Sequence, residues 1–229
     1  MTNKFYTNVQ LAGDTILYRG YEEDGEGNVE SVQFRTRFSP TLYVTSKRKE
    51  QFKTLDGRPV APMQFETARK AREFIQQYNG VEGFEVHGYE RFVYQYMRQE
   101  FPNPVDYNIN MMKIFALDIE VQCENGFPDV EAAAEEMLSI TIKDMVTKKY
   151  HCWAVREFEP PEGVEAHIFW NERDMLKDFI EWWAQNTPDI LTGWNVNLYD
   201  VPYICRRVDR ILGEKWMKSL SPWNRANER

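Results

Sequence analysis

The order of the strands and helices predicted between residues 112 and 212 constrains the fold of this chain more than any other feature. Short apolar runs bounded by polar turns predict strands, and longer segments with one apolar face and an N-cap residue predict helices. The predicted elements are strands over 112–121, 138–143 and 150–155, a helix over 172–186 capped by Asn171, a short buried strand over 190–194 and a helix that opens at Asp200. Three strands followed by helix, strand and helix predict a mixed sheet with a right-handed crossover and a ligand site at its strand ends.

The first hundred residues follow a different pattern, in which short strands alternate with turns. The predicted elements are strands over 15–21, 29–38 and 41–45, a tight turn at Asp56-Gly57 and a helix that Thr67 caps and that runs to Tyr78. Pro102 and Pro104 can continue neither a helix nor a paired strand. We therefore expect an α/β protein of two domains: an α+β amino-terminal domain over 1–107, mostly β with one helix, and a mixed-sheet domain over 108–229.

The charge of the chain is acidic and unevenly distributed. Of the formal net charge of −8, residues 1–107 contribute −1 and residues 108–229 contribute −7. A protein that coats nucleic acid by bulk attraction needs clustered Lys and Arg, so any contact with nucleic acid must be local. The acidic surplus of the second half is either a solvated acidic face or a carboxylate cluster that holds divalent metal.

Composition argues against several other classes of protein. The longest apolar stretches span a few residues, far short of the run of about 20 that crosses a bilayer, so we expect no membrane partner. Three cysteines without CxxC spacing and three histidines without ligand spacing predict neither a disulfide framework nor a zinc site. The aromatic and basic residues over 89–98 could stack on single-stranded nucleic acid, but packing in the core of a strand is favoured.

Asp118 and Glu120 are the first candidate site residues. They lie two apart on a predicted strand, so both side chains leave the same face, while Leu117 and Ile119 pack on the other. Charged residues alternate with apolar ones on many half-exposed strands. Carboxylates in the middle of a sheet are costly, however, unless a cation binds them.

Asp200 is the third candidate, at the point where the strand over 190–194 turns into a helix. A plain helix N-cap explains Asp200 on local grounds. If this strand lies beside the strand of Asp118, three carboxylates converge with Asn195 and Tyr199 beside them, and such a cluster suits Mg²⁺ or Mn²⁺. Two divalent ions about 4 Å apart hydrolyse a phosphodiester without a Ser, Cys or His nucleophile.

The two elements resemble the first and second exonuclease motifs of the family B DNA polymerases of T-even-like bacteriophages. In that family an Asp-Ile-Glu strand is paired with an Asn, a short gap, an aromatic residue and an Asp. The likeness here is carried by Asp118-Ile-Glu120, Gly126-Phe-Pro128, Ile190 through Val196 and Asp200 through Tyr203. It covers most of the chain and is weaker before about residue 100.

This resemblance implies an amino-terminal piece of a replicative DNA polymerase, with an RNase H-like 3′-to-5′ proofreading exonuclease after the first domain. Asp118, Glu120 and Asp200 would be catalytic metal ligands, and Asn195 and Tyr199 would bind the terminal nucleotide. The chain is expected to stop inside the exonuclease domain, before the third motif and the palm. A complete two-metal site with Mg²⁺ or Mn²⁺ is therefore expected only in the complete domain, and the isolated chain is expected to be inactive or nearly so.

The resemblance also implies partners and a location. The expected partners are primer-template DNA and the 3′ end of single-stranded DNA, in the cytoplasm of an infected bacterium, with RNA as a further candidate for the first domain. One alternative is a non-catalytic module that binds RNA or single-stranded DNA. Others are one piece of a polymerase encoded as two polypeptides, and a stand-alone nuclease that would need Asp209 or Glu214 as a further acid.

Overall fold

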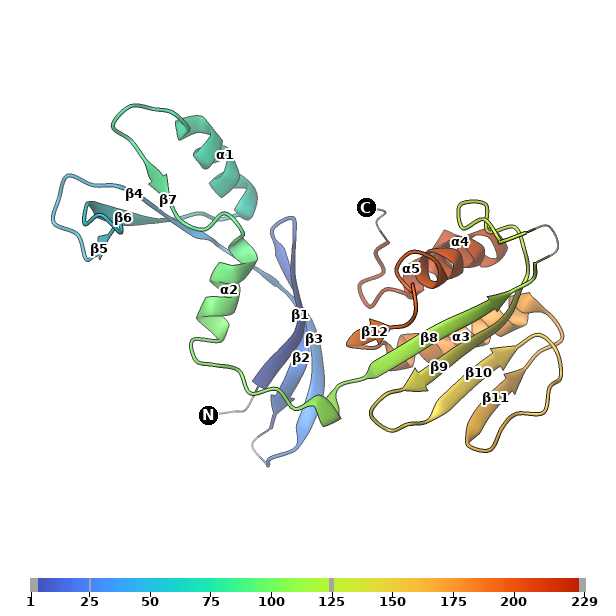
Figure 1. Cartoon of the computed structure of the whole chain (residues 1–229). Helices are drawn as coiled ribbons and strands as arrows, with labels where there is room; N and C mark the ends of the chain where they lie inside the picture. Colours follow the sequence, from blue (N-terminus) through green and yellow to red (C-terminus); the bar gives the residue numbers. More distant parts are fainter. Residues whose placement is uncertain (1–3, 25, 124–125, 227–229) are drawn as a thin grey trace. The chain divides into compact units, whose positions relative to one another are not determined.

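A computed structural model describes residues 4–24, 26–123 and 126–226 of the chain. The chain divides into two compact units, residues 1–107 and 108–229, which are described in turn. Both combine strands with helices, and the second contains a mixed five-stranded sheet, so the predicted α/β class is confirmed (Figure 1). No helix in the described part of the chain has both the length and the apolar character that a membrane crossing requires.

The first sheet of unit 1–107 is an antiparallel meander of three long strands. Its order is β1(Lys4–Ala12), β2(Thr15–Glu23), β3(Val29–Arg37). The strands predicted over 15–21 and 29–38 are confirmed as β2 and β3, whereas β1 was not predicted. The alternation of β1 is broken by a bulge between Tyr6 and Asn8, which shifts the side-chain period by one residue and hides the strand pattern.

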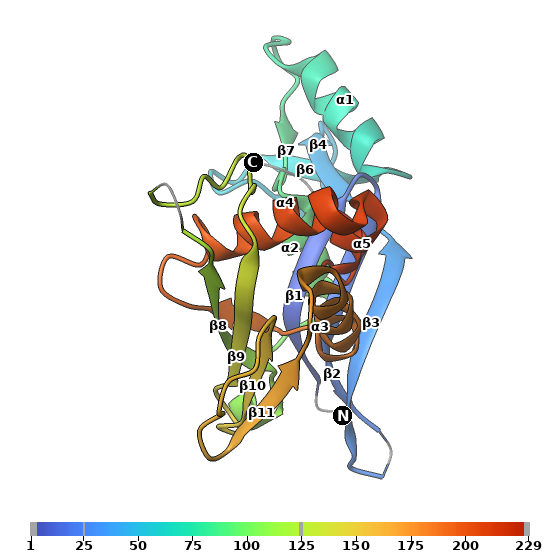
Figure 2. The same cartoon turned by 90° about the vertical axis from the view of Figure 1, so that its right-hand side faces the viewer.

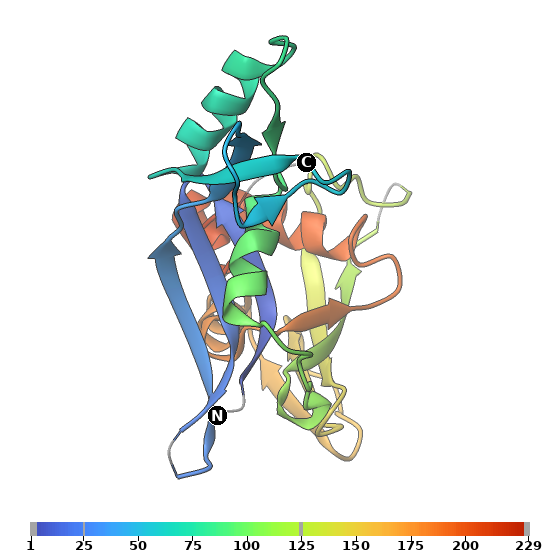
Figure 3. The same cartoon turned by 90° about the vertical axis from the view of Figure 1, so that its left-hand side faces the viewer.

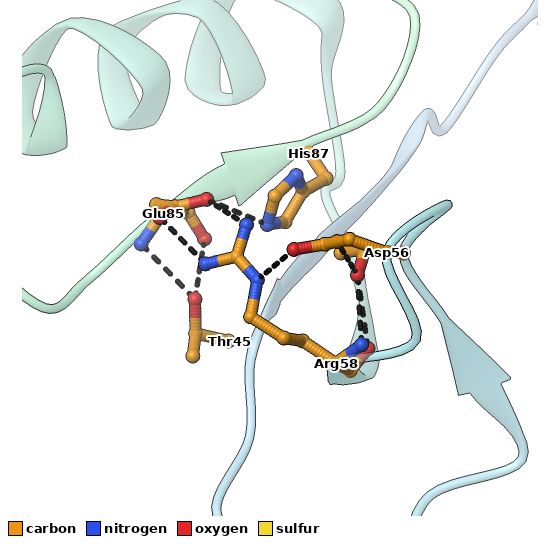
Figure 4. A network of polar contacts seen from close by, with 6 residues as sticks. Thr45, Asp56, Arg58, Glu85 and His87 are labelled. Carbon is orange, nitrogen blue, oxygen red and sulfur yellow. Dashed lines mark hydrogen bonds and ion pairs between the residues drawn. The ribbon is translucent and has the colours of Figure 1, made fainter.

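Four shorter strands form the second sheet of this unit. Its members are β4(Thr41–Thr45), β5(Phe52–Lys53), β6(Pro59–Gln64) and β7(Val86–His87), in the order β5-β6-β4-β7. The strand predicted over 41–45 is β4, and Asp56-Gly57 forms the expected turn between β5 and β6, with Gly57 at a φ of +88°. In Figure 4 the guanidinium of Arg58 lies between Asp56 and both carboxylate oxygens of Glu85, which links this turn to the segment leading into β7.

Two helices complete unit 1–107. The first, α1(Ala68–Tyr78), begins as predicted, because the Thr67 hydroxyl accepts a hydrogen bond from the amide of Lys70 at 3.1 Å. The second, α2(Phe92–Glu100), lies alongside β1 (Figure 3), where packing in a strand was predicted; that prediction was wrong. Phe92 and Tyr96 are four apart and both buried, which is the helical period.

The mixed sheet of unit 108–229 carries the site. After a 3₁₀ turn at Ile109–Met111, the elements are β8(Ile114–Val121), β9(Met137–Asp144), β10(Tyr150–Ala154), β11(Val164–Ile168), α3(Glu172–Asn186), β12(Ile190–Thr192), α4(Asp200–Leu212) and α5(Glu214–Ser219). The sheet order is β11-β10-β9-β8-β12, in which β8, β9 and β10 are antiparallel neighbours, while β11 runs parallel to β10 and β12 parallel to β8. All elements predicted in this unit are present, and β11 and α5 are additions.

Helices α3 and α4 pack on one face of this sheet, where the core of the unit lies (Figure 2). Leu117 and Ile119 of β8 point into this core. The strand predicted over 190–194 was expected to be buried, but β12 is the edge strand and Ile190 is 47% exposed. A strand of three residues at an edge covers little of its neighbour, so the adjoining part of β8 stays open to other groups.

A buried ion pair joins the two helices of the core. Arg207 on α4 donates two hydrogen bonds to Glu172 at the start of α3, at 2.7 and 2.6 Å, and both side chains are at least 92% buried. Arg207 also donates to the carbonyl oxygens of Ala133 and Ala134, and Glu172 accepts from the amide of Met137. Burial alone would lower the pKa of Arg207, but the hydrogen bonds and charge of Glu172 outweigh it and raise that pKa.

Candidate active site

The strand β8 presents Asp118 and Glu120 on the face opposite to the core. Leu117 and Ile119 are 3% and 7% exposed, whereas both acids are exposed, so the predicted alternation of the strand is confirmed. Among the described residues, neither carboxylate has a hydrogen-bond or ion-pair partner. Their negative charges are therefore neutralised by no side chain that the structure describes.

Asp200 connects the second predicted element to the first. It is the first residue of α4 and is 4% exposed, and its Oδ1 atom accepts a hydrogen bond of 3.1 Å from the backbone amide of Ile119, between Asp118 and Glu120 on β8. Burial raises the pKa of the Asp200 carboxyl, and the negative charge of Asp118 raises it further, against the hydrogen bonds that lower it. Asp200 thus faces the edge of β8 and does more than begin a helix.

The pairing of β12 with β8 brings these groups together. The two strands run parallel with Thr192 beside Ala116, so the strand at 190–192 lies beside the strand of Asp118, as the convergence of the three acids requires. Gly193 follows, and a Cβ atom there would lie 2.5 Å from the carbonyl oxygen of Leu117, a distance that side-chain carbons do not tolerate. Glycine therefore lets the chain cross β8 closely enough for Asp200 to reach the strand.

The turn between β12 and α4 carries Asn195 and Tyr199. Asn195 is exposed and has a φ of +56°, and its carbonyl oxygen accepts the amides of Leu198 and Tyr199 at 2.9 and 3.1 Å. Asparagine is among the few residues other than glycine that adopt this left-handed conformation readily. Tyr199 is half-buried, and burial followed by the negative charge of Asp200 raises the pKa of its phenol. Both predicted substrate-binding residues thus lie on the turn that leads to Asp200.

Three large apolar side chains near this turn are exposed, and none of them is among the predicted site residues. Phe127, Trp194 and Leu198 are 81%, 92% and 76% exposed, and the Phe127 ring lies 4.8 Å from that of Tyr199. Exposed aromatic rings are the groups on which nucleic-acid bases stack. Their positions in the sequence could have indicated this role, because each stands in a Gly-, Asn- or Pro-rich turn, where a large apolar residue does not pack in the core.

The donor set fits a hard divalent cation in kind, although the three carboxylates do not form a tight shell. Asp118, Glu120 and Asp200 offer oxygen ligands only, which is the preference of Mg²⁺ and Mn²⁺. In the part of the chain that the structure describes, the one trio of His, Cys, Asp or Glu whose ligand atoms all lie within 4.8 Å of one another is a different one, His151, Glu165 and His167. The acidic edge of β8 therefore offers the oxygen ligands that such a cation needs, but its three carboxylates stand too far apart to surround one ion as they are placed.

Comparison with known proteins gives one family and several viral relatives. The family described as DNA polymerase family B, exonuclease domain, matches residues 92–228. The chain is 28% identical to a DNA-directed DNA polymerase of Enterobacteria phage T4, over 99% of this chain and 27% of that protein. It is 26% identical to the DNA-directed DNA polymerase of Escherichia phage RB69, over 96% of this chain and 27% of that protein.

More distant similarity covers only part of the chain. A DNA polymerase catalytic subunit of human herpesvirus 6A is 29% identical over 46% of this chain and 11% of that protein. The chain spans about a quarter of the length of the two phage proteins, since 27% of each is covered. The two relatives that are similar over nearly the whole chain are thus phage polymerases.

Proposed function

Because this chain belongs to the family B DNA polymerases, through their exonuclease domain, we propose that residues 108–229 contribute to a 3′-to-5′ proofreading exonuclease within a replicative DNA polymerase. The observation that carries this proposal is the hydrogen bond from the Ile119 amide to Asp200. It joins two acidic segments about 80 residues apart in the sequence at one strand edge. An acid that served only as a helix cap would have no reason to reach β8.

The roles proposed for the acids follow from where they lie. Asp118 and Glu120 project from one face of β8, and Asp200 approaches the same strand from its edge. In the complete domain these carboxylates would hold Mg²⁺ or Mn²⁺. Such ions, when bound, activate a water molecule and stabilise the leaving oxygen of a phosphodiester. The raised pKa of Asp200 is consistent with this role, because burial beside Asp118 leaves a negative charge that a cation would offset.

The turn at 193–199 is proposed to hold the terminal nucleotide of a single strand. Asn195 offers an exposed amide, and Tyr199 stands next to Asp200 in sequence. Exposed Phe127 and Trp194 supply faces for base stacking, a contact worth about 1–3 kcal/mol per base. Stacking uses the faces of the rings and the bases, so this part of the contact does not depend on the net charge of −8.

We further propose that the 229-residue chain alone has at most trace exonuclease activity. The family pattern includes a third motif, a Tyr with an Asp four residues later, and the residues after Asp200 contain no such pair. Asp209 and Glu214 lack that spacing. A second polypeptide that carries the missing acid would then restore hydrolysis.

Titration calorimetry with Mn²⁺ tests the acidic edge. We expect saturable binding to the chain, lost in Asp118→Asn and in Glu120→Gln, and kept in the matched variant Glu162→Gln, which removes an exposed carboxylate from a loop after β10. Equal binding by all four proteins would show that Mn²⁺ is held elsewhere. Absence of binding by the unchanged chain would remove the metal role of these acids in this chain.

A nuclease assay tests the reaction. A 3′-labelled single strand should release at most trace nucleotide with the chain and Mn²⁺, and release should rise when the rest of a phage polymerase is added as a separate polypeptide. Robust release by the chain alone would contradict the need for a further acid. Binding of the strand without any release, even after that addition, would favour the non-catalytic alternative.

A further inference from the structure

Two histidines and a glutamate gather on β10 and β11, on the core side of the sheet. The parallel pairing of these strands places Glu165 directly beside His151, and His167 two residues further along β11. The Nδ1 atom of His151 lies 3.4 Å from Oε2 of Glu165, and the Nε2 atom of His167 lies 3.7 Å from Oε1 of the same carboxylate. All three ligand atoms lie within 4.8 Å of one another.

Both contacts are at ion-pair distance, yet neither is a hydrogen bond, and such spacings suit ligands of one ion. The Nδ1 atom of His151 and the Nε2 atom of His167 are buried and make no hydrogen bond with the described residues. In a tetrahedral zinc site with metal–nitrogen bonds of about 2.0–2.1 Å, neighbouring ligand atoms are about 3.3 Å apart. The observed 3.4 and 3.7 Å lie close to that spacing but end on different oxygens of Glu165, so this side chain would have to turn to bring one oxygen near both nitrogens.

The two imidazole rings are held in place by aromatic neighbours. The ring of His167 stacks on the buried ring of Trp153, with centroids 4.7 Å apart and planes within 6°, and the ring of His151 lies 4.9 Å from that of Trp182. Ligands whose orientation is fixed beforehand lose little conformational entropy when they bind a metal. The site is therefore organised around its ligand atoms.

Asp178 on α3 stands behind His167, where metal-bound histidines usually have a carboxylate. Its Oδ2 atom accepts a hydrogen bond of 2.8 Å from the indole of Trp153 and lies 3.8 Å from the Nδ1 atom of His167. A carboxylate at the second nitrogen fixes the tautomer of a ligating histidine and raises its basicity. At 3.8 Å this oxygen makes no hydrogen bond to His167, but a small rotation of the Asp178 side chain would bring it to Nδ1 and leave the Nε2 lone pair free for a metal.

We propose that His151, Glu165 and His167 bind one Zn²⁺ ion, with Asp178 as a positioning residue and a water molecule in the fourth position. Two imidazoles and one carboxylate form a ligand set that Zn²⁺ accepts, whereas Mg²⁺ prefers oxygen alone. The exposed side of Glu165, whose side chain is 63% accessible, leaves space for the water. The ion would fasten the edge strand β11 to β10.

This zinc site is separate from the acidic edge of β8. The pairing of Ile119 with Ile140 and of Ile140 with Trp153 puts the histidines on the core face, while Asp118 and Glu120 lie on the opposite face. The proposal does not depend on the proposed exonuclease function. A cation at one site cannot share ligands with the other.

Titration of the chain with Zn²⁺, and with Co²⁺ as a coloured substitute, tests the proposal. We expect one equivalent to bind, visible absorption typical of tetrahedral Co²⁺, and a melting temperature that rises by several degrees with Zn²⁺. Millimolar Mg²⁺ and the Asp118→Asn substitution should change none of these. His151→Gln and His167→Gln should each abolish the Co²⁺ absorption, and Asp178→Asn should weaken binding 10- to 100-fold with a changed spectrum.

His87→Gln is the matched control, because His87 lies in unit 1–107 on β7. It should bind Zn²⁺ as the unchanged chain does. If a histidine variant fails to fold, NMR of the unchanged chain decides: Zn²⁺ should shift the imidazole signals of His151 and His167 and leave those of His87 in place. Absence of stoichiometric binding, or signals that do not move at His151 and His167, would overturn the proposal.

Discussion

At the scale of single residues, the burial of Asp200 sets a conflict between stability and function. Its Oδ1 atom accepts the Ile119 amide, while burial and the charge of Asp118 raise its pKa. A folded pKa above the unfolded value means that ionisation of Asp200 opposes folding. The stability that the neutral Asp200 carboxyl contributes is fully present below the pKa of the unfolded chain, and it is lost as the pH rises through the pKa of the folded chain.

We therefore expect Asp200→Asn to stabilise the metal-free chain at neutral pH by on the order of 1 kcal/mol, since the amide oxygen can still accept from Ile119. The gain should shrink as the pH falls through the raised pKa of Asp200, because the native carboxyl is then neutral as well. Urea unfolding in the presence of a chelator, at several pH values, measures it. A variant that is less stable at every pH would show that helix capping by the charge dominates.

Most of the candidate residues could be chosen from the sequence, but their surroundings could not. Asp118 and Glu120 follow from the period of a strand, and Asp200 from its place between a strand and a helix. Whether Asp200 caps its own helix or reaches β8 depends on the register of β12, which the sequence does not encode locally. The proposed zinc ligands could not be recognised from the sequence, because Glu165 and His167 are 14 and 16 residues from His151 and come close to it only through the pairing of β11 with β10.

At the scale of elements, the Glu172–Arg207 pair holds α3 to α4 and is more than a surface contact. Removing one partner of a buried pair leaves the other charge uncompensated, which costs about 3–5 kcal/mol. We expect Glu172→Ala to lower the free energy of unfolding by that amount, measured by urea denaturation. It should also broaden NMR signals at the start of β9, where Glu172 accepts the Met137 amide.

The exposed pair of Glu214 and Lys218 on α5 is the control for this prediction, because its side chains are 68% and 41% accessible. Glu214→Ala should change the unfolding midpoint far less, since exposed ion pairs contribute little. A similar loss of unfolding free energy in both variants would mean that Glu172 acts only as a negative charge in the first turn of its helix.

Elements with regular periods were predicted well, and those defined by their partners were not. Helix α3 was predicted with its cap, since Asn171 Oδ1 accepts the amide of Asp174 as the sequence suggests. The strand β11 was missed because two of its five residues, Glu165 and His167, are polar, and α2 was assigned to a strand because aromatic residues favour strands. Tertiary packing overrode propensity in both.

At the scale of the whole molecule, two separate cores predict two separable unfolding events. The buried clusters of 1–107 and 108–229 share no residue. Gly20 and Gly193 form a matched pair of probes, because a Cβ atom at either would lie within 2.5 Å of a backbone oxygen, of Phe5 and Leu117 respectively. Neither glycine needs a positive φ, so crowding is the only effect of an added methyl group.

Each Gly→Ala substitution should destabilise its own unit by about 1–3 kcal/mol, as overpacking does. Gly20→Ala should leave Mn²⁺ binding intact, whereas Gly193→Ala should weaken it by displacing the chain that carries Asp200. Calorimetric melting and Mn²⁺ titration of both variants measure the two effects. A single transition that shifts equally in both variants would show that the units unfold together.

The shortness of β12 has a consequence for how such a chain can vary. The last paired residue of β12, Thr192, lies beside Ala116. Further along β8, the backbone amide of Ile119 faces the same edge and donates its hydrogen bond to the Asp200 carboxylate instead of to a strand. A strand only a few residues longer would offer its own carbonyl to that amide and compete with the carboxylate. An insertion in β12 would thus leave the sheet intact but displace Asp200 from the Ile119 amide. The length of β12 should therefore tolerate less change than the length of any other strand in this sheet.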